Sequence, residues 1–160
     1  MSSGAKERRS GTRLGRTAAA VGKGIFAGFA GTAAMTAGQL VEMKLRGRKG
    51  STTPGDLVCG LLGVVPEGDA ERERFSGLVH WTRGTGWGVL RGLLGAAGLR
   101  GVPALAADFA IIMGGDFVLL TARGVAPAPW RWTREDLAVE ALHKGVLATA
   151  THLAYQQLDR

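Results

Sequence analysis

The chain of 160 residues is poor in the side chains that disulfides and nucleophilic catalysis require. Cys59 is the only cysteine, so no intrachain disulfide can form. Ser76 is the only serine beyond residue 51, which leaves little material for a Ser-His-Asp arrangement. We therefore predict no catalytic residue, no metal site and no cofactor, and we expect a protein that is not an enzyme.

Aromatic residues are also scarce, at 6% of the chain, and Tyr155 is the only tyrosine. The formal net charge of +7 would suit a nucleic acid or an anionic membrane surface as a partner. Weakly charged runs of about 20 residues recur along the chain, which a soluble basic domain does not need. We therefore predict no nucleic-acid partner, and we expect the lipid bilayer as the principal partner.

Four long apolar runs dominate the sequence, and each approaches the ~20 residues that span a bilayer. They lie at 24–41, 75–99, 102–122 and 137–158. The sequence predicts an all-α fold, a transmembrane four-helix bundle, with helices at about 17–45, 70–99, 102–122 and 134–158. Residues 17–160 form one membrane domain, and residues 1–16 form a basic, disordered tail. A cleaved signal peptide over residues 1–37 is the alternative for the N-terminal region.

A shorter apolar stretch, Leu57–Val65, separates the first two runs and is too short to span. Pro54 suits the first turn of a helix, so we predict a short interfacial helix over about 54–64, with packing against the bundle as the alternative placement. Before the last run, Trp130 and Trp132 are typical of an interfacial aromatic belt. Thr133, with Asp136 three residues later, predicts a capping box at the start of the last helix.

The stretch "HWTRGTGWGVLRGLLGAAG" (residues 80–98) contains six glycines. A dinucleotide-binding loop requires G-x-G-x-x-G after a strand, and Val89 occupies the position of the last glycine. A spacing of four residues fits better, because it places small residues on one ridge of a helix. Small ridges let transmembrane helices approach closely. We predict helix packing through small residues of the first and second long helices: Gly24, Gly28, Gly31, Gly84, Gly88 and Gly92.

Charged and polar residues interrupt the last three apolar runs, where each unpaired charge would be costly in lipid. Arg83 and Arg91 are eight residues apart, as are Asp108 and Asp116. An antiparallel hairpin would bring Arg91 to Asp108 and Arg83 to Asp116 in one register. We interpret these pairs as a structural ladder, with an ion pathway or proton relay as the alternative. The candidate buried polar and ion-pair residues are His80, Arg83, Arg91, Asp108, Asp116, Glu140 and His143.

Glu140 and His143 form a Glu-x-x-His motif, which is half of a di-iron carboxylate site in helical bundles. Only one copy exists, whereas a full site needs a second copy and two further carboxylates. An ion pair between Glu140 and Lys144, four residues apart on one helix, is the simpler interpretation.

Four stretches carry a resemblance to a known group: "GFAGTAAMTAGQLVEMKLRGR", "STTPGD", "LVHWTRGTGWGVLRGLLG" and "EALHKGVLATATHLAY". Together they resemble small uncharacterised bacterial integral membrane proteins of the YagU type. The resemblance lies in a glycine-rich first helix, a His-aromatic start to the second, and a histidine in the last. It implies an integral membrane protein, and no site residue is carried over.

These observations lead to a prediction of location and function. We expect a multi-pass protein of the bacterial cytoplasmic (inner) membrane with both termini on the same side. The basic cluster before the first helix favours the cytoplasmic side, although basic residues are almost evenly distributed between the two sides. We expect a structural or interaction component that forms a homo-oligomer or joins a larger membrane complex. The alternative is a small channel, transporter-like or proton-relay protein that uses the buried His, Arg, Asp and Glu residues.

Overall fold

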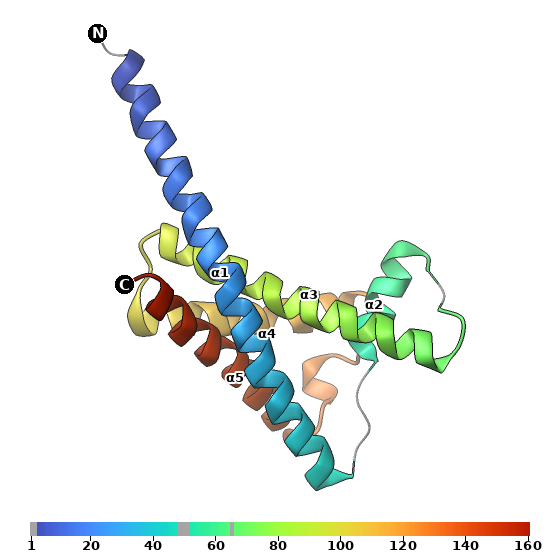
Figure 1. The fold of residues 1–160 in the computed structure, drawn as a ribbon. Coiled ribbons are helices and arrows are strands. Elements are labelled where there is room, and N and C mark those ends of the chain that lie inside the picture. Colours follow the sequence, from blue (N-terminus) through green and yellow to red (C-terminus); the bar gives the residue numbers. More distant parts are fainter. Residues whose placement is uncertain (1–2, 48–51, 65) are drawn as a thin grey trace.

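The computed structural model describes residues 3–47, 52–64 and 66–160, and this part of the chain is all-α, without a strand (Figure 1). The α-helices are α1 (Ser3–Arg46), α2 (Thr53–Leu62), α3 (Asp69–Ala96), α4 (Gly101–Ala122) and α5 (Arg134–Leu158). A short 3-10 helix, η1 (Pro129–Arg131), lies between α4 and α5. The prediction of an all-α fold is confirmed.

The first helix differs from the prediction, because α1 begins at Ser3 rather than near Thr17. The disordered tail expected over residues 1–16 is therefore wrong for residues 3–16, while residues 1 and 2 lie outside the described residues. Residues such as Ala5 and Lys6 favour helix, and lengthening an existing helix avoids the cost of nucleation. The N-terminal part of α1 projects past the rest of the molecule (Figure 1).

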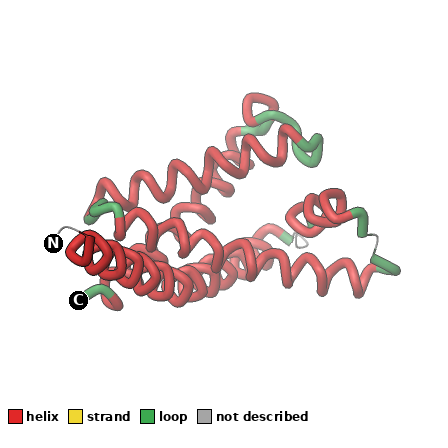
Figure 2. Tube along the Cα trace, turned by 90° about the horizontal axis from the view of Figure 1, so that it is seen from above, coloured by secondary structure: helices red, strands yellow, loops and turns green. Residues whose placement is uncertain are grey.

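α1 is the central element, because it packs against both α3 and α5. α3 runs antiparallel to it, since Gly24 of α1 lies against Gly88 of α3 and Thr36 lies against His80. α5 also lies along α1, where Lys23 Nζ is 2.9 Å from Asp159 Oδ1, and α3 and α5 contact each other. α4 packs mainly against α5 and less against α3, and α2 packs against α3. Seen from above, the described chain consists of helices joined by loops (Figure 2).

The contact between α1 and α3 is a contact between backbones. A Cβ added to Gly28 would lie 2.8 Å from Gly88 Cα, and one added to Gly24 would overlap Gly88 O. Gly92 meets the backbone of Ala20 in the same way. The remaining predicted packing glycines meet side chains and backbone of other helices: Gly84 meets Thr32, and Gly31 meets Thr151 and Leu147. All six glycines are buried, so they lie at the helix contacts that the small-residue ridges predict.

Local signals fix the ends of the later helices. The capping box is confirmed, because the Asp136 N–H donates to Thr133 Oγ1 at 3.1 Å. The turn from α3 to α4 contains Gly98 and Gly101 with φ of 89° and 59°, a conformation that favours glycine. α2 rests on α3 where Gly55 approaches Ser76, and a Cβ on Gly55 would lie 2.8 Å from Ser76 Cα.

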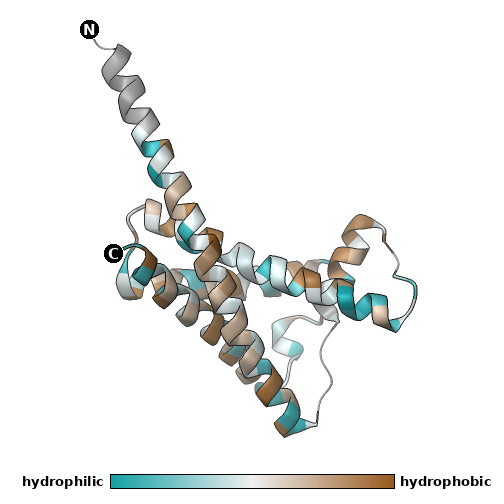
Figure 3. Ribbon diagram, in the orientation of Figure 1, coloured by the Kyte–Doolittle hydropathy of each residue, from teal (hydrophilic) through white to brown (hydrophobic). Residues whose placement is uncertain are grey.

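Many large apolar side chains are exposed. Figure 3 shows the ribbon coloured by hydropathy, with apolar residues along α1. Phe26 on α1 is 72% exposed and Val118 on α4 is 70% exposed. By length and composition, two segments could cross a membrane, Thr12–Arg46 and Gly101–Ala122. α3 and α5, which carry the histidines and several buried charges, are not among them.

Candidate polar cavity and buried charges

A cavity of about 960 Å³ lies between α1, α3, α4 and α5, at the end of the bundle near the C-terminus of α1. Its wall carries four of the candidate polar residues and also Lys144, the predicted partner of Glu140. α3 contributes His80 and Arg83, α4 contributes Asp116, and α5 contributes Glu140 and Lys144. The remaining wall includes apolar and aromatic groups such as Met35, Trp81, Trp87 and Leu147. The cavity therefore combines an apolar body with a cluster of charges.

Asp116 is the centre of this charge cluster. Arg83 pairs with its Oδ1, and Lys144 Nζ lies 2.8 Å from its Oδ2. Lys144 also lies 3.2 Å from Glu140 Oε1, one turn earlier on α5. Asp116 and Lys144 are buried, whereas Arg83 and Glu140 are partly exposed. Two cations and two carboxylates thus form a network without net charge, which is the form in which charges can be buried.

The predicted pairing of α3 and α4 holds at this level, because Arg83 and Asp116 are the pair that the spacing of eight residues indicates. The predicted ion pair of Glu140 with Lys144 is also present. In the part of the chain that the structure describes, no three His, Cys, Asp or Glu side chains come together as metal ligands. Glu140 forms an ion pair with Lys144. His143, which precedes Lys144 in the sequence, is buried, at 5% exposed.

His80 joins α3 to α1 at the edge of the cavity. Its Nε2 lies 2.9 Å from Thr36 Oγ1, and the same hydroxyl donates to Thr32 O at 2.7 Å. A hydroxyl has a single proton to donate, so His80 Nε2 must be the donor to Thr36. The imidazole is thereby held in one tautomer, which leaves Nδ1 as its acceptor.

A second polar level lies two turns further along α3, around Arg91. Arg91 is 2% exposed, and its Nε donates to His152 Nδ1 at 3.2 Å. Its guanidinium carbon lies 4.3 Å from the centre of the Tyr155 ring, a cation-π geometry. His152 accepts through Nδ1, so its ring is neutral in this arrangement. Arg91 is therefore held by α5.

Asp108 is fully buried, at 0% exposed, and neither carboxylate oxygen has a hydrogen-bond partner. The predicted ion pair of Arg91 with Asp108 is wrong, because no such pair within 4.0 Å is found among the described residues. α4 packs mainly on α5, and the long Arg91 side chain reaches His152 and Tyr155 instead.

An apolar layer separates the two polar levels. Ile112 lies one turn from Asp108 and one turn from Asp116 on the same face of α4. It is fully buried and packs with Met35, Leu147 and Ala148. The charges of the bundle are thus divided between an upper level at Arg91 and Asp108 and a lower level at the cavity.

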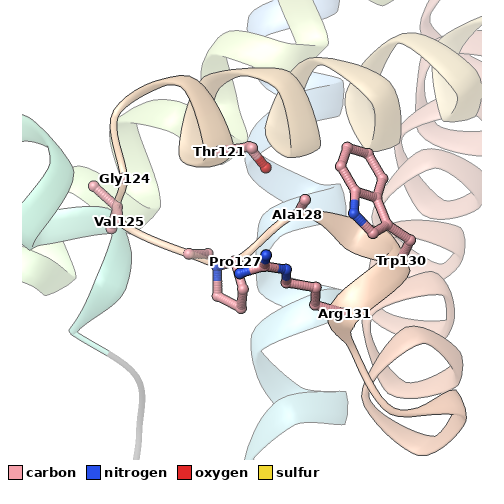
Figure 4. Close-up of a pocket in the computed structure, with 8 residues that line it drawn as sticks. Thr121, Gly124, Val125, Pro127, Ala128, Trp130 and Arg131 are labelled. Carbon is pink, nitrogen blue, oxygen red and sulfur yellow. The ribbon is translucent and has the colours of Figure 1, made fainter.

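A second hollow, of about 450 Å³, lies at the connection between α4 and α5 (Figure 4). It is lined by Thr121, by Gly124 to Ala128, and by Trp130 and Arg131. Trp130 is 83% exposed. Trp132 is anchored instead, because its Nε1 donates to Pro127 O at 2.7 Å and its ring packs edge-on against Phe117. The hollow contains one ionisable side chain and no convergent polar groups.

Some partners in these sites were not among the candidate residues, notably Thr36, His152 and Tyr155, and Lys144 was predicted only as the partner of Glu140. Lys144 and His152 stand out in an apolar run, so burial cost alone could have marked them. Thr36 and Tyr155 carry no such signal, because their roles depend on which helix lies opposite.

No family model matches this chain, and neither a curated protein nor a solved structure matches it.

Proposed function

We propose that this chain is an integral membrane protein with four spans, α1, α3, α4 and α5, in the bacterial cytoplasmic membrane. The distribution of side chains supports the proposal, because Arg91, Asp108 and Asp116 are buried while Phe26 and Val118 are exposed. A soluble protein places these classes the other way round. In the most apolar stretch of each candidate span, the buried share is only 39% for Thr12–Arg46 and 28% for Gly101–Ala122. These fractions are low for core helices of a soluble protein.

The less apolar helices fit the same placement. α3 exposes Leu78 and Leu93, and α5 exposes Leu142 and Leu153, while their charges turn inward. Inward charges facing a bundle interior are the arrangement that membrane helices tolerate. Four spans place both termini on one side, for which we propose the cytoplasm. The resemblance to YagU-type inner-membrane proteins belongs to this proposal.

We further propose a transport-type function, in which protons or small ions enter the bundle through the cavity. The observation that carries this proposal is that the network of Arg83, Asp116, Lys144 and Glu140 borders a cavity of about 960 Å³. A ladder that only fixes helix register is best served by tight apolar packing around it, because water access weakens its ion pairs. Open space beside buried charges is typical of ion and proton pathways.

A structural or interaction component, working as a homo-oligomer or within a larger membrane complex, is the second candidate. The absence of net charge in the network supports it, since a ladder needs its charges to cancel. The backbone contact between α1 and α3 supports it as well, because such contacts build rigid bundles.

The test has two stages. Resistance of the protein to extraction from membranes by alkaline carbonate checks the placement, and release into the soluble fraction would contradict it. Purified protein is then reconstituted into liposomes that contain a pH-sensitive dye, and proton, K⁺ and Na⁺ gradients are imposed in turn. We expect flux above that of protein-free liposomes for one of these ions. Glu140→Gln should remove most of the flux, and Leu142→Ala, on the exposed face of the same helix, should keep it. An absence of flux with inserted protein would favour the structural component.

A further inference from the structure

Asp108 and Asp116 form a natural comparison within one helix. They are eight residues apart on the same face of α4, and both are buried, at 0% and 2% exposed. Asp116 is paired with two cations, Arg83 and Lys144. Asp108 has neither an ion pair nor a hydrogen bond in the part of the chain described. Two carboxyl groups of the same helix thus have opposite environments.

We propose that Asp108 is a proton-binding site, a carboxyl that holds a proton at neutral pH and exchanges it with water. An ionised carboxylate in such a site would be a buried charge without hydrogen bonds, which proteins avoid by neutralising the group. A protonated carboxyl removes the charge and needs no counterion. The inference deepens the proposed transport function and rests on it for the destination of the proton.

The surroundings favour a proton over a metal ion. The titratable and charged groups at this level are Arg91 on α3 and His152 and Tyr155 on α5. Lys23 and Asp159, which pair with each other, lie nearer the end of the bundle. A metal cation beside Asp108 would face the Arg91 guanidinium, and repulsion would oppose its entry. A proton converts the carboxylate into a neutral carboxyl, so no net positive charge is left beside the guanidinium.

Arg91 also supplies a means of release. Its Nη1 is buried and has no hydrogen-bond partner, so a donor is available at the level of Asp108. When the carboxyl loses its proton to water, the new carboxylate can accept from Arg91 Nη1. The guanidinium would then stabilise the ionised form, while in the protonated form it remains with His152 and Tyr155. The Ile112 layer lies between this site and the cavity.

Infrared spectroscopy of the purified protein in lipid tests the proposal. At neutral pH, the wild type should show the C=O stretch of a protonated carboxylic acid, and Asp108→Asn should remove it. The band should shift on transfer to heavy water, because an exchanging proton becomes a deuteron. A spectrum without a band that depends on Asp108, or a band that does not shift, overturns the proposal.

Thermal unfolding gives an independent comparison between the two aspartates. Asp108→Asn replaces a neutral group by a neutral one, so its Tm should stay within about 3 °C of the wild type. Asp116→Asn leaves Arg83 and Lys144 without their carboxylate, so its Tm should fall by roughly 10 °C, or the variant should not fold. Equal losses in the two variants would mean that Asp108 is ionised. If the band is present and ion flux is absent, the proton site stands and the transport function fails.

Discussion

Gly28 and Gly88 lie with their backbones in contact, so that a Cβ on Gly28 would approach Gly88 Cα to 2.8 Å. This contact sets the distance between α1 and α3 at this crossing, because neither glycine has a side chain to separate the two helices there. α5 packs against α1 and also contacts α3. Small residues at such a crossing allow van der Waals contact over long stretches of backbone.

The first prediction is that Gly88→Ala destabilises the bundle. The added methyl group would overlap the backbone of Gly24 and Gly28, and such overpacking costs about 1–3 kcal/mol. Gly86→Ala, two residues away on the same helix, is the control, because Gly86 has nothing within 4 Å of its added Cβ. Unfolding of both variants in one detergent checks this. A variant at Gly88 as stable as the one at Gly86 would contradict a packing role.

The second prediction concerns the energetic coupling of Arg83 and Asp116. Arg83→Leu alone leaves Asp116 with one cation, and Asp116→Leu alone leaves two cations without their carboxylate, each at a cost of about 3 kcal/mol or more where the pair is buried. The double variant should recover part of that loss, with a coupling energy of about 1–3 kcal/mol.

A second cycle, on Arg91 and Asp108, serves as the comparison. The absence of an ion pair between them predicts a coupling energy smaller than that of Arg83 and Asp116. Both cycles are measured by chemical unfolding under the same conditions. A larger coupling energy for Arg91 and Asp108 than for Arg83 and Asp116 would contradict this prediction and indicate an ion pair at the upper level.

The sequence allowed much of this architecture to be predicted, because each signal was local or periodic. Apolar runs marked the helices, a period of four residues marked Gly24, Gly28, Gly84 and Gly88, and a spacing of eight residues marked the pair of Arg83 with Asp116. The start of α1 was missed since polarity was interpreted as disorder, although its residues also favour helix.

The partner of Arg91 was beyond prediction for a different reason. The hairpin register gave the depth of Arg91 correctly, but depth does not determine direction around the helix bundle. An arginine side chain is long enough to reach either neighbouring helix, and the position of α5 beside α3 has no signature in the sequence. The contacts with His152 and Tyr155, and with them the isolation of Asp108, follow only from the assembled helices.

The third prediction concerns the ring beneath Arg91. Tyr155→Phe should change the stability little, because the ring face that the guanidinium contacts remains. Tyr155→Leu removes the ring and should cost about 1–2 kcal/mol from the lost cation-π contact, in addition to lost packing. Thermal unfolding of the two variants measures the difference. Equal stability of the phenylalanine and leucine variants would show that the ring face contributes nothing.

The last prediction tests which surface faces lipid. Cys59→Ser gives a background without cysteine, because Cys59 is the only one in the chain. Spin labels are then attached at Phe26→Cys and Val118→Cys, on exposed apolar positions, and at Glu135→Cys, on an exposed polar position at the start of α5. In liposomes, the labels at 26 and 118 should relax faster with oxygen, which concentrates in the bilayer, than with a water-soluble nickel complex. The label at 135 should show the opposite preference, because an exposed charge before the last span belongs in water. Preference for the nickel complex at both 26 and 118 would place these helices in water and refute the membrane placement.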